Sequence, residues 1–208
     1  MSLLTNWGYT LTDVNAMTDM LTPSDFDDFT AGKYSGDARI GSDITAACDA
    51  IRNYCGWHVY PSAACELNTT FFDGRVTVVR GAVLIQLPAR YVSAVSSVSI
   101  GGVEYTSFVA EPSGLLKVYD VSLAGLREYA PVVVTYTAGL PEGLMGGIRE
   151  LIAHRVTHAL ASSSGVQSET AGGVSITYSA NWTNSARATA LADDNKEVLA
   201  PYRLRGVF

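Results

Sequence analysis

The sequence predicts an α+β fold, because its apolar residues follow two different periods in different parts of the chain. Residues 42–55 and 144–162 repeat their apolar positions at helical spacing. Residues 66–138 instead hold short runs rich in Val, Ser, Thr and Tyr, separated by turn residues. We therefore expect a helical bundle of about three to four helices, with an antiparallel β module inserted between the first and second main helices.

The first clear helix is predicted over residues 42–55. Ser42 is the expected N-cap, and Asp43 lies in the first turn, where a negative charge is favourable. Gly56 is placed to end the helix. The expected buried face consists of Ile44, Ala47, Cys48, Ile51, Tyr54 and Cys55.

Residues 1–40 are rich in Thr and Asp and predict an extended N-terminal arm with one short helix. That helix is expected near residues 24–30, with Ser24 as its N-cap. A helix this short needs tertiary contacts to persist.

The β module is predicted from alternating runs that end at Gly or Pro turn signals such as Asp73-Gly74 and Gly101-Gly102. The expected strands are Arg75–Val79, Val83–Leu87, Val92–Ile100, Val103–Phe108, Leu115–Val118 and Val132–Thr137.

The second main helix is predicted over residues 144–162, after the helix-start pair Pro141-Glu142. Arg155 falls within its apolar stripe, so we expect its guanidinium to reach solvent or to pair with a carboxylate. The stripe itself consists of Leu144, Ile148, Leu151, Ile152, Val156, Ala159 and Leu160.

The C-terminal region is expected to hold a small-residue loop at 162–173 and a hairpin strand at 174–179. A third, weaker helix follows over 184–199, and Pro201 stops it before a basic tail. The predicted organisation is an N-terminal arm (1–40), a helical core (41–65 and 139–208) and an inserted β module (66–138).

Composition limits the classes of function. The chain has 208 residues and a net charge of −6, and only 16% of its residues are charged. Tight nucleic-acid binding needs clustered Lys and Arg, which 14 scattered basic residues do not supply. We find neither a signal-peptide pattern nor an apolar run of about 20 residues, so we expect a cytosolic product that does not enter a membrane.

Motifs that carry chemistry are sparse. Glu150, His154 and His158 recur at i, i+4 and i+8, but further metal ligands are not in view, so a polar helix face is the favoured interpretation over a metal site. Neither a Gly-x-Ser-x-Gly nucleophile motif nor a phosphate-binding loop occurs. We therefore predict a protein that is not an enzyme and has no catalytic residue, metal or cofactor.

Three cysteines, an odd number, fit reduced thiols. Cys48 and Cys55 lie seven residues apart on the predicted helix, about 10 Å by helical rise, which exceeds disulfide reach. We expect all three to be small buried apolar residues.

Several segments, in this order, resemble the head–tail connector (adaptor, head completion) family of tailed bacteriophages. The first is a helix end with an aromatic-Cys-Gly-aromatic stretch followed by Pro-Ser. A Val-x-Tyr-x-x-Gly-hydrophobic-Pro step leads into the second helix, and a Leu-x-Pro-Tyr-Arg segment lies near the end. The matching segments are Ile51–Ser62, Leu87-Pro88, Val92–Gly102, Val132–Pro141, Ser175–Ser179 and Leu199–Arg203, which together span roughly residues 42–205.

This resemblance implies a structural virion protein of the neck, assembled in the host cytoplasm. Its subunits form a ring of about twelve copies between the portal protein and the tail or stopper protein, through which DNA passes during packaging and ejection. DNA is then expected only to pass through an acidic channel, whose wall repels it. The implied portal-docking residues are Leu199, Pro201, Tyr202, Arg203, Arg205 and Phe208. The implied channel-side or stopper-side loop includes Gly165, Gly172, Gly173, Ser175 and Tyr178.

Two other interpretations remain open. One is another phage neck or tail structural protein, such as a tail terminator or completion protein, although the helix–β–helix order favours the connector. The other is a β-rich ligand-binding or carbohydrate-binding module, since three Trp and eleven Tyr could line a sugar groove. Trp7, Trp57 and Trp182 lie outside the predicted strands, which weakens that interpretation.

Overall fold

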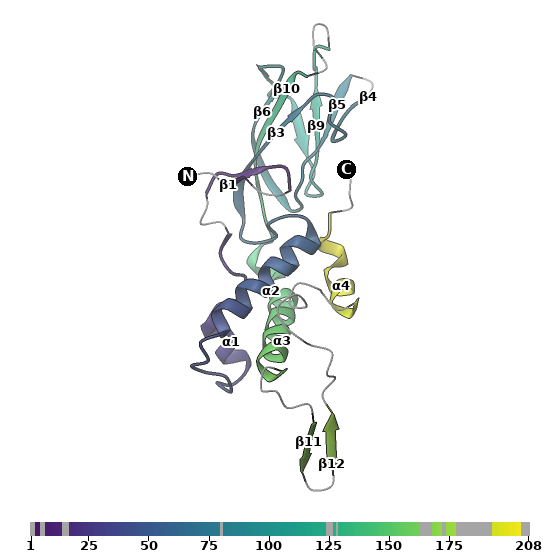
Figure 1. Cartoon of the computed structure of the whole chain (residues 1–208). Helices are drawn as coiled ribbons and strands as arrows, with labels where there is room; N and C mark the ends of the chain where they lie inside the picture. Colours follow the sequence, from purple (N-terminus) through teal and green to yellow (C-terminus); the bar gives the residue numbers. More distant parts are fainter. Residues whose placement is uncertain are drawn as a thin grey trace. The chain divides into compact units, whose positions relative to one another are not determined.

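The computed structural model describes residues 3–4, 7–13, 17–79, 81–123, 127, 129–162, 168–171, 174–177 and 193–204. Helices and antiparallel sheets are both present, so the predicted mixed α+β class is confirmed (Figure 1). The chain divides into two compact units. The strand unit comprises residues 1–18, 55–144 and 202–208, and the helix unit comprises residues 19–54 and 145–201.

The larger sheet of the strand unit has the strand order β1-β2-β3-β10-β6-β7, and every neighbouring pair is antiparallel. Its centre is β10, which pairs over its whole length with β3 and β6. These strands are β1 (Leu3–Leu4), β2 (Thr10–Leu11), β3 (Ala63–Thr70), β6 (Val92–Ile100), β7 (Val103–Glu104) and β10 (Pro131–Ala138).

The smaller sheet has the order β4-β5-β9-β8, also antiparallel throughout. Its strands are β4 (Val76–Val79), β5 (Ala82–Gln86), β8 (Phe108–Ala110) and β9 (Leu115–Tyr119). Five of the six strands expected from the sequence are therefore present within about two residues of their predicted ends. The sixth, expected over 103–108, is divided between β7 in one sheet and β8 in the other.

The core of the strand unit follows from strict alternation along the strands. In β10, Val132, Val134, Tyr136 and Ala138 are buried, and the residues between them are more exposed. The same alternation holds in β5 and β9, so each sheet has one buried face. Buried residues from both sheets form the apolar core of this unit: Cys65, Leu67, Val83, Ile85, Val98, Ile100, Leu116 and Val118.

The N-terminal arm contributes a strand to this unit. Leu11 pairs with Cys65 of β3, and the Thr12 N–H donates to the Ala64 carbonyl at 3.0 Å. Tyr9 and Leu11 are both buried. Residues 9–12 are therefore an integral part of the sheet and its core.

In the helix unit, α1 (Pro23–Phe29) confirms the predicted short helix, but its N-cap is Thr22 and the expected cap, Ser24, is wrong. The Thr22 hydroxyl accepts from the Asp25 N–H at 3.1 Å, and the Asp25 carboxylate accepts in return from the Thr22 backbone. This reciprocal pair is a capping box, and Pro23 occupies the first helical position.

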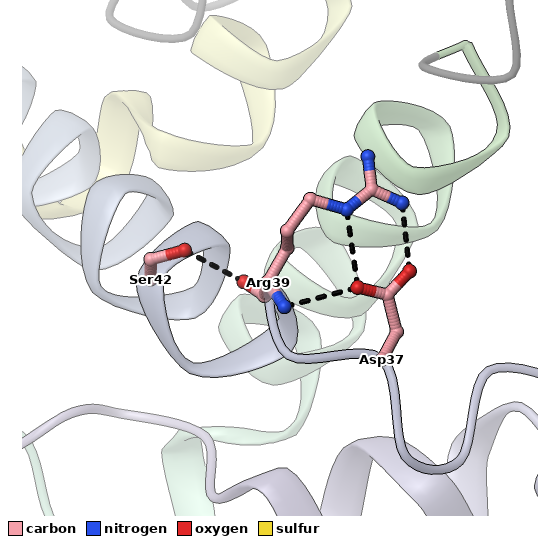
Figure 2. A network of polar contacts seen from close by, with 3 residues as sticks. All are labelled: Asp37, Arg39 and Ser42. Carbon is pink, nitrogen blue, oxygen red and sulfur yellow. Dashed lines mark hydrogen bonds and ion pairs between the residues drawn. The ribbon is translucent and has the colours of Figure 1, made fainter.

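Helix α2 (Ile40–Cys55) confirms the first main helix, but Ser42 is not its N-cap. Its hydroxyl lies inside the first turn and donates to the Arg39 carbonyl at 2.8 Å (Figure 2). The turn just before the helix is instead stabilised by Asp37. Its carboxylate accepts from the Arg39 N–H at 3.0 Å and from the Arg39 guanidinium at 2.7 Å. These bonds lower the pKa of Asp37 from 3.8 to about 2. The predicted apolar face is otherwise confirmed, with Tyr54 half-buried.

Helix α3 (Gly146–Ser162) follows the 3₁₀ turn η2 (Glu142–Leu144). Leu144 precedes the helix and is exposed, and Ala159 is exposed as well, so neither belongs to the buried stripe. Ala153 is buried instead. Arg155 is half-exposed, and its partial burial lowers its pKa.

Two further elements lie in the C-terminal region. The predicted hairpin is confirmed by β11 (Ser168–Ala171) paired with β12 (Val174–Thr177). Helix α4 (Asp193–Leu199) confirms the end of the third helix, and the expected part over 184–192 lies outside the described residues. Pro201 lies in the 3₁₀ turn η3 (Ala200–Tyr202), directly after the point where α4 ends.

Gly139 is required where β10 leaves the sheet. Its φ is 148°, and a Cβ added there would lie 2.6 Å from the Pro61 carbonyl oxygen and closer still to the Ser62 Cα. A side chain therefore fits neither the backbone conformation nor the space.

We expect Gly139→Ala to lower the free energy of unfolding by about 2–4 kcal/mol, because the added methyl must displace backbone. Gly143→Ala is the matched control, since nothing lies within 4 Å of its added Cβ. Denaturant unfolding of both variants checks this, and equal midpoints would contradict the requirement for glycine at 139.

The Asp37 carboxylate gives a pH dependence. Its folded pKa of about 2 lies below its ordinary value of 3.8, so the stabilisation is complete above that value and is lost as the pH falls through about 2. We expect Asp37→Asn to lower the melting temperature at pH 7 but to have little effect at pH 2. Helical circular dichroism follows the transition, and Asp28→Asn is the exposed control. A deficit that is the same at both pH values would contradict this prediction.

Candidate functional site

The C-terminal segment is anchored to the exit of α2. Gly56, at φ 78°, turns the chain out of the helix. The next residue, Trp57, is fully buried, and its Nε1–H donates to the Tyr202 carbonyl at 2.8 Å. One step further on, the Leu204 N–H donates to the Cys55 carbonyl at 2.9 Å. Residues 202–204 therefore lie across the end of the helix, held by two hydrogen bonds that connect distant parts of the sequence.

A second set of contacts joins the α2 exit to the end of β10. The Leu140 N–H donates to the Val59 carbonyl at 2.8 Å. His58 is fully buried, and its Nε2 lies 2.9 Å from the Ala138 carbonyl. Because a carbonyl only accepts, Nε2 carries the proton in this contact.

The other side of the His58 ring contacts the N-terminal arm. The Tyr9 hydroxyl lies 2.8 Å from His58 Nδ1 and accepts from the His58 backbone N–H at 3.0 Å. With Nε2 protonated, Nδ1 accepts the Tyr9 proton, so a neutral imidazole satisfies every contact described. The His58 ring therefore joins the N-terminal arm to the end of β10.

The residues proposed to dock on a portal protein have different environments. Leu199 is fully buried, and Tyr202 is half-buried with its ring 6.5 Å from that of Tyr91. Pro201 and Arg203 are exposed. Arg205 and Phe208 lie outside the described residues. Of the described members, only Pro201 and Arg203 therefore present their side chains at the surface.

Helix α4, which precedes this segment, is fixed to α2 within the helix unit. The Tyr54 hydroxyl donates to the Lys196 carbonyl at 3.2 Å. This bond accounts for the partial exposure of Tyr54, whose ring belongs to the apolar face while its hydroxyl reaches another helix.

Of the expected channel-side or stopper-side loop, Ser175 lies in β12 opposite Thr170 of β11. Gly165, Gly172, Gly173 and Tyr178 lie outside the described residues. The described backbone shows the hairpin, and the role of this element stays a prediction.

The candidate metal residues lie on one face of α3. His154 Nε2 is 3.7 Å from Glu150 Oε1, and both side chains are about two-thirds exposed. The His154 ring packs edge-on against Phe29, with 5.3 Å between ring centroids. Within the described residues, no group of three or more His, Cys, Asp or Glu side chains could hold a metal ion.

The three cysteines are buried thiols, as the sequence predicted. Burial raises the pKa of Cys48 to about 11, of Cys55 to about 12 and of Cys65 to about 12. A thiol in this state is a poor nucleophile and a poor metal ligand at neutral pH.

The outer surface of the strand unit is poor in charge. On the larger sheet, small and uncharged side chains are exposed at Ala64, Asn68, Ser93, Ala94 and Ser97. On the smaller sheet, Val79 and Val109 are exposed. The exposed valines of β4 were not predicted, although three Val within four residues cannot all face one core under strict alternation.

None of the helices in the described part of the chain is long and apolar enough to cross a bilayer.

The comparisons with known proteins give similarity among solved structures. No family model matches the chain, and no curated protein matches it. Among solved structures, a chain of the "neck of empty GTA particle computed with C6 symmetry" is similar, with a TM-score of 0.46 and 16% sequence identity. That similarity covers 96% of this chain and 97% of the other.

The anchor at Trp57 predicts a specific loss. We expect Trp57→Phe to lower the free energy of unfolding by about 1–3 kcal/mol, because it removes the bond to Tyr202 and leaves a small cavity. Amide exchange at Leu204 should become faster as the segment detaches. Tyr129→Phe, at an exposed position, is the control and should leave both unchanged. Unchanged protection at Leu204 in Trp57→Phe would show that the segment is held by other contacts.

Proposed function

We propose that this chain is a head–tail connector (adaptor) subunit, a non-enzymatic structural protein of the virion neck of a tailed bacteriophage or a similar particle. Copies form a ring between the portal and the tail or stopper, and DNA passes through its centre. In this proposal the helices form a bundle into which the β module is inserted.

The observation that carries the proposal is that one segment that resembles the connector family contacts two others. They are Ile51–Ser62, Val132–Pro141 and Leu199–Arg203. The Trp57–Tyr202 bond joins the first segment to the third across 145 positions of sequence. The Leu140–Val59 and His58–Ala138 contacts join the first to the second. The resemblance therefore corresponds to one structural feature, in which the first family-like segment contacts both of the others.

The surface chemistry supports a role in assembly. Large, uncharged polar and apolar surfaces suit contacts between subunits, where charged residues are depleted at the centre. The strand unit offers such surface on both sheets. A ring subunit needs two unlike surfaces that meet head to tail.

The charge distribution supports a channel wall in the helix unit. Residues 19–54 contain seven Asp against one Lys and two Arg, a net charge of −4. Asp25, Asp28 and Asp43 are at least partly exposed. An acidic wall repels the phosphate backbone and lets DNA slide without binding.

For portal docking, the structure supports dividing the predicted residues by role. Leu199 and Tyr202 fix the segment to the fold, and the exposed Pro201 and Arg203, together with the tail that follows, are proposed to reach the portal. The hairpin β11–β12 with its flanking glycines is proposed to face the channel or the stopper.

Arg203 supplies the test. We expect the purified chain, mixed with a portal protein from the same source, to form a ring-shaped complex, detected by light scattering and electron microscopy. Arg203→Glu should weaken that complex about tenfold or more, because it reverses an interfacial charge. Lys33→Glu, the same change on an exposed residue of the helix unit, is the matched control. A chain that never joins the portal, and instead binds glycans or turns over a substrate, would end the proposal.

A further inference from the structure

Strands β4 and β8 are the two edges of the smaller sheet, and both are poor in the residue types that commonly protect an edge. Native edge strands are commonly protected by charged residues, by proline or by a covering segment. Val76–Val79 and Phe108–Ala110 contain neither a charge nor a proline. Val78, Val79 and Val109 are 44%, 45% and 52% exposed. By contrast, β7 at the edge of the larger sheet carries Glu104.

The backbone groups of β4 that point away from its sheet follow from its bonds to β5. The Gln86 N–H donates to the Arg75 carbonyl at 2.8 Å, so alternate residues from Arg75 onward face β5. The Val78 N–H and carbonyl and the Val76 carbonyl therefore point outward. The Val76 N–H donates to Asp73 in the preceding turn.

The outward-pointing backbone groups of β8 likewise follow from its bonds to β9. The Tyr119 N–H donates to the Ser107 carbonyl, and the Glu111 N–H donates to the Leu115 carbonyl, both at 2.8 Å. Phe108 and Ala110 therefore direct their N–H and carbonyl groups away from β9. In the part of the chain that is described, these outward groups of β4 and β8 make no backbone hydrogen bond to another strand.

The two edges are complementary in direction. Since each strand of the order β4-β5-β9-β8 is antiparallel to its neighbour, β4 and β8 run in opposite directions on opposite edges. A second copy placed beside the first in the same orientation therefore brings its β8 antiparallel to β4 of the first.

The edges are also complementary in register. If Val78 lies opposite Phe108 of the second copy, Val76 lies opposite its Ala110, and outward donors meet outward acceptors at both positions. The faces match as well. Within one copy, Val78 and Phe108 are each aligned with a buried residue, Val83 and Val118 respectively, so both lie on the core side of the sheet. The core side of one sheet thus continues into the core side of the next.

We propose that copies of this chain join head to tail by pairing β4 of one copy with β8 of the next, in the register that sets Val78 opposite Phe108. This inference rests on the proposed function, because it names the contact between copies by which the ring would close. Main-chain hydrogen bonds give such an added strand its affinity, and the matched faces give its register.

A disulfide between copies tests the register. Thr77 and Val109 face each other in it as a non-hydrogen-bonded pair, with Cα atoms about 4.5 Å apart, and both are exposed. Oxidation of the Thr77→Cys, Val109→Cys double variant should give a ladder of linked copies that disappears on reduction. An equal mixture of the two single variants should give dimers only. The native cysteines are buried and do not compete.

The control moves one cysteine out of register. Val79 lies on the same strand face as Thr77, so the Val79→Cys, Val109→Cys variant should link about tenfold less. Linked dimers from Thr77→Cys alone would overturn the head-to-tail contact in favour of β4 pairing with itself. The absence of linkage in the first double variant, up to about millimolar protein, would overturn it outright.

A proline substitution in β4 distinguishes loss of the contact between copies from loss of folding. The Val78 N–H points away from β5, so Val78→Pro removes no hydrogen bond within the sheet, and it should lower linkage of the double variant about tenfold. Val78→Thr, which keeps the N–H, should leave linkage unchanged. Linkage that survives Val78→Pro would overturn the proposed hydrogen bonding.

The two proposals fail separately. Rings on the portal without linkage between residues 77 and 109 would leave the connector function standing and remove this contact. Linked copies that form neither a ring nor a portal complex would keep the contact and remove the function.

Discussion

The strand unit depends on how the buried polar groups at the α2 exit are satisfied. Trp57 and His58 are both fully buried, and an unmade hydrogen bond there would cost about 1–3 kcal/mol. Each polar group finds its partner on a different part of the chain: Tyr202 near the C-terminus, Ala138 at the end of β10, and Tyr9 in the N-terminal arm. Three regions distant in sequence are thereby fixed around one short segment.

The sequence predicted best those elements whose patterns are local. The first main helix and β6 were predicted almost to the residue, because helical spacing in one and clear turns beside the other leave few alternatives. Strand β3 was missed, since Ala63–Thr70 has few β-branched or aromatic residues and is buried only by its neighbours. The run at 103–108 was taken as one strand, because a sequence pattern does not reveal where a chain passes from one sheet to another.

The helix caps also could not be predicted from the local sequence pattern alone. Ser24 and Ser42 are favourable capping residues, but Thr22 and the Asp37–Arg39 pair lie a few residues earlier and make the actual contacts. For the candidate site, the resemblance named residues 199–208 for portal docking without distinguishing buried residues from surface residues. Leu199 is fully buried within its unit, and the Tyr202 carbonyl accepts from Trp57, and only the folded structure defines these contacts. No sequence motif marked β4 and β8 as edges. The direction of each strand, and which of its residues point their N–H and C=O groups outward, are defined only by the pairing within the sheet.

The division of the chain into interleaved units has a consequence for how it is made. The helix unit includes α4 and the strand unit includes residues 202–204, so each is completed by a segment distant in sequence from the first part of that unit. Domains generally fold as they leave the ribosome, from the N-terminus onward. Neither unit has all of its packing partners until residues 193–204 have been synthesised. The apolar surface that these residues cover therefore stays exposed in the nascent chain until that point.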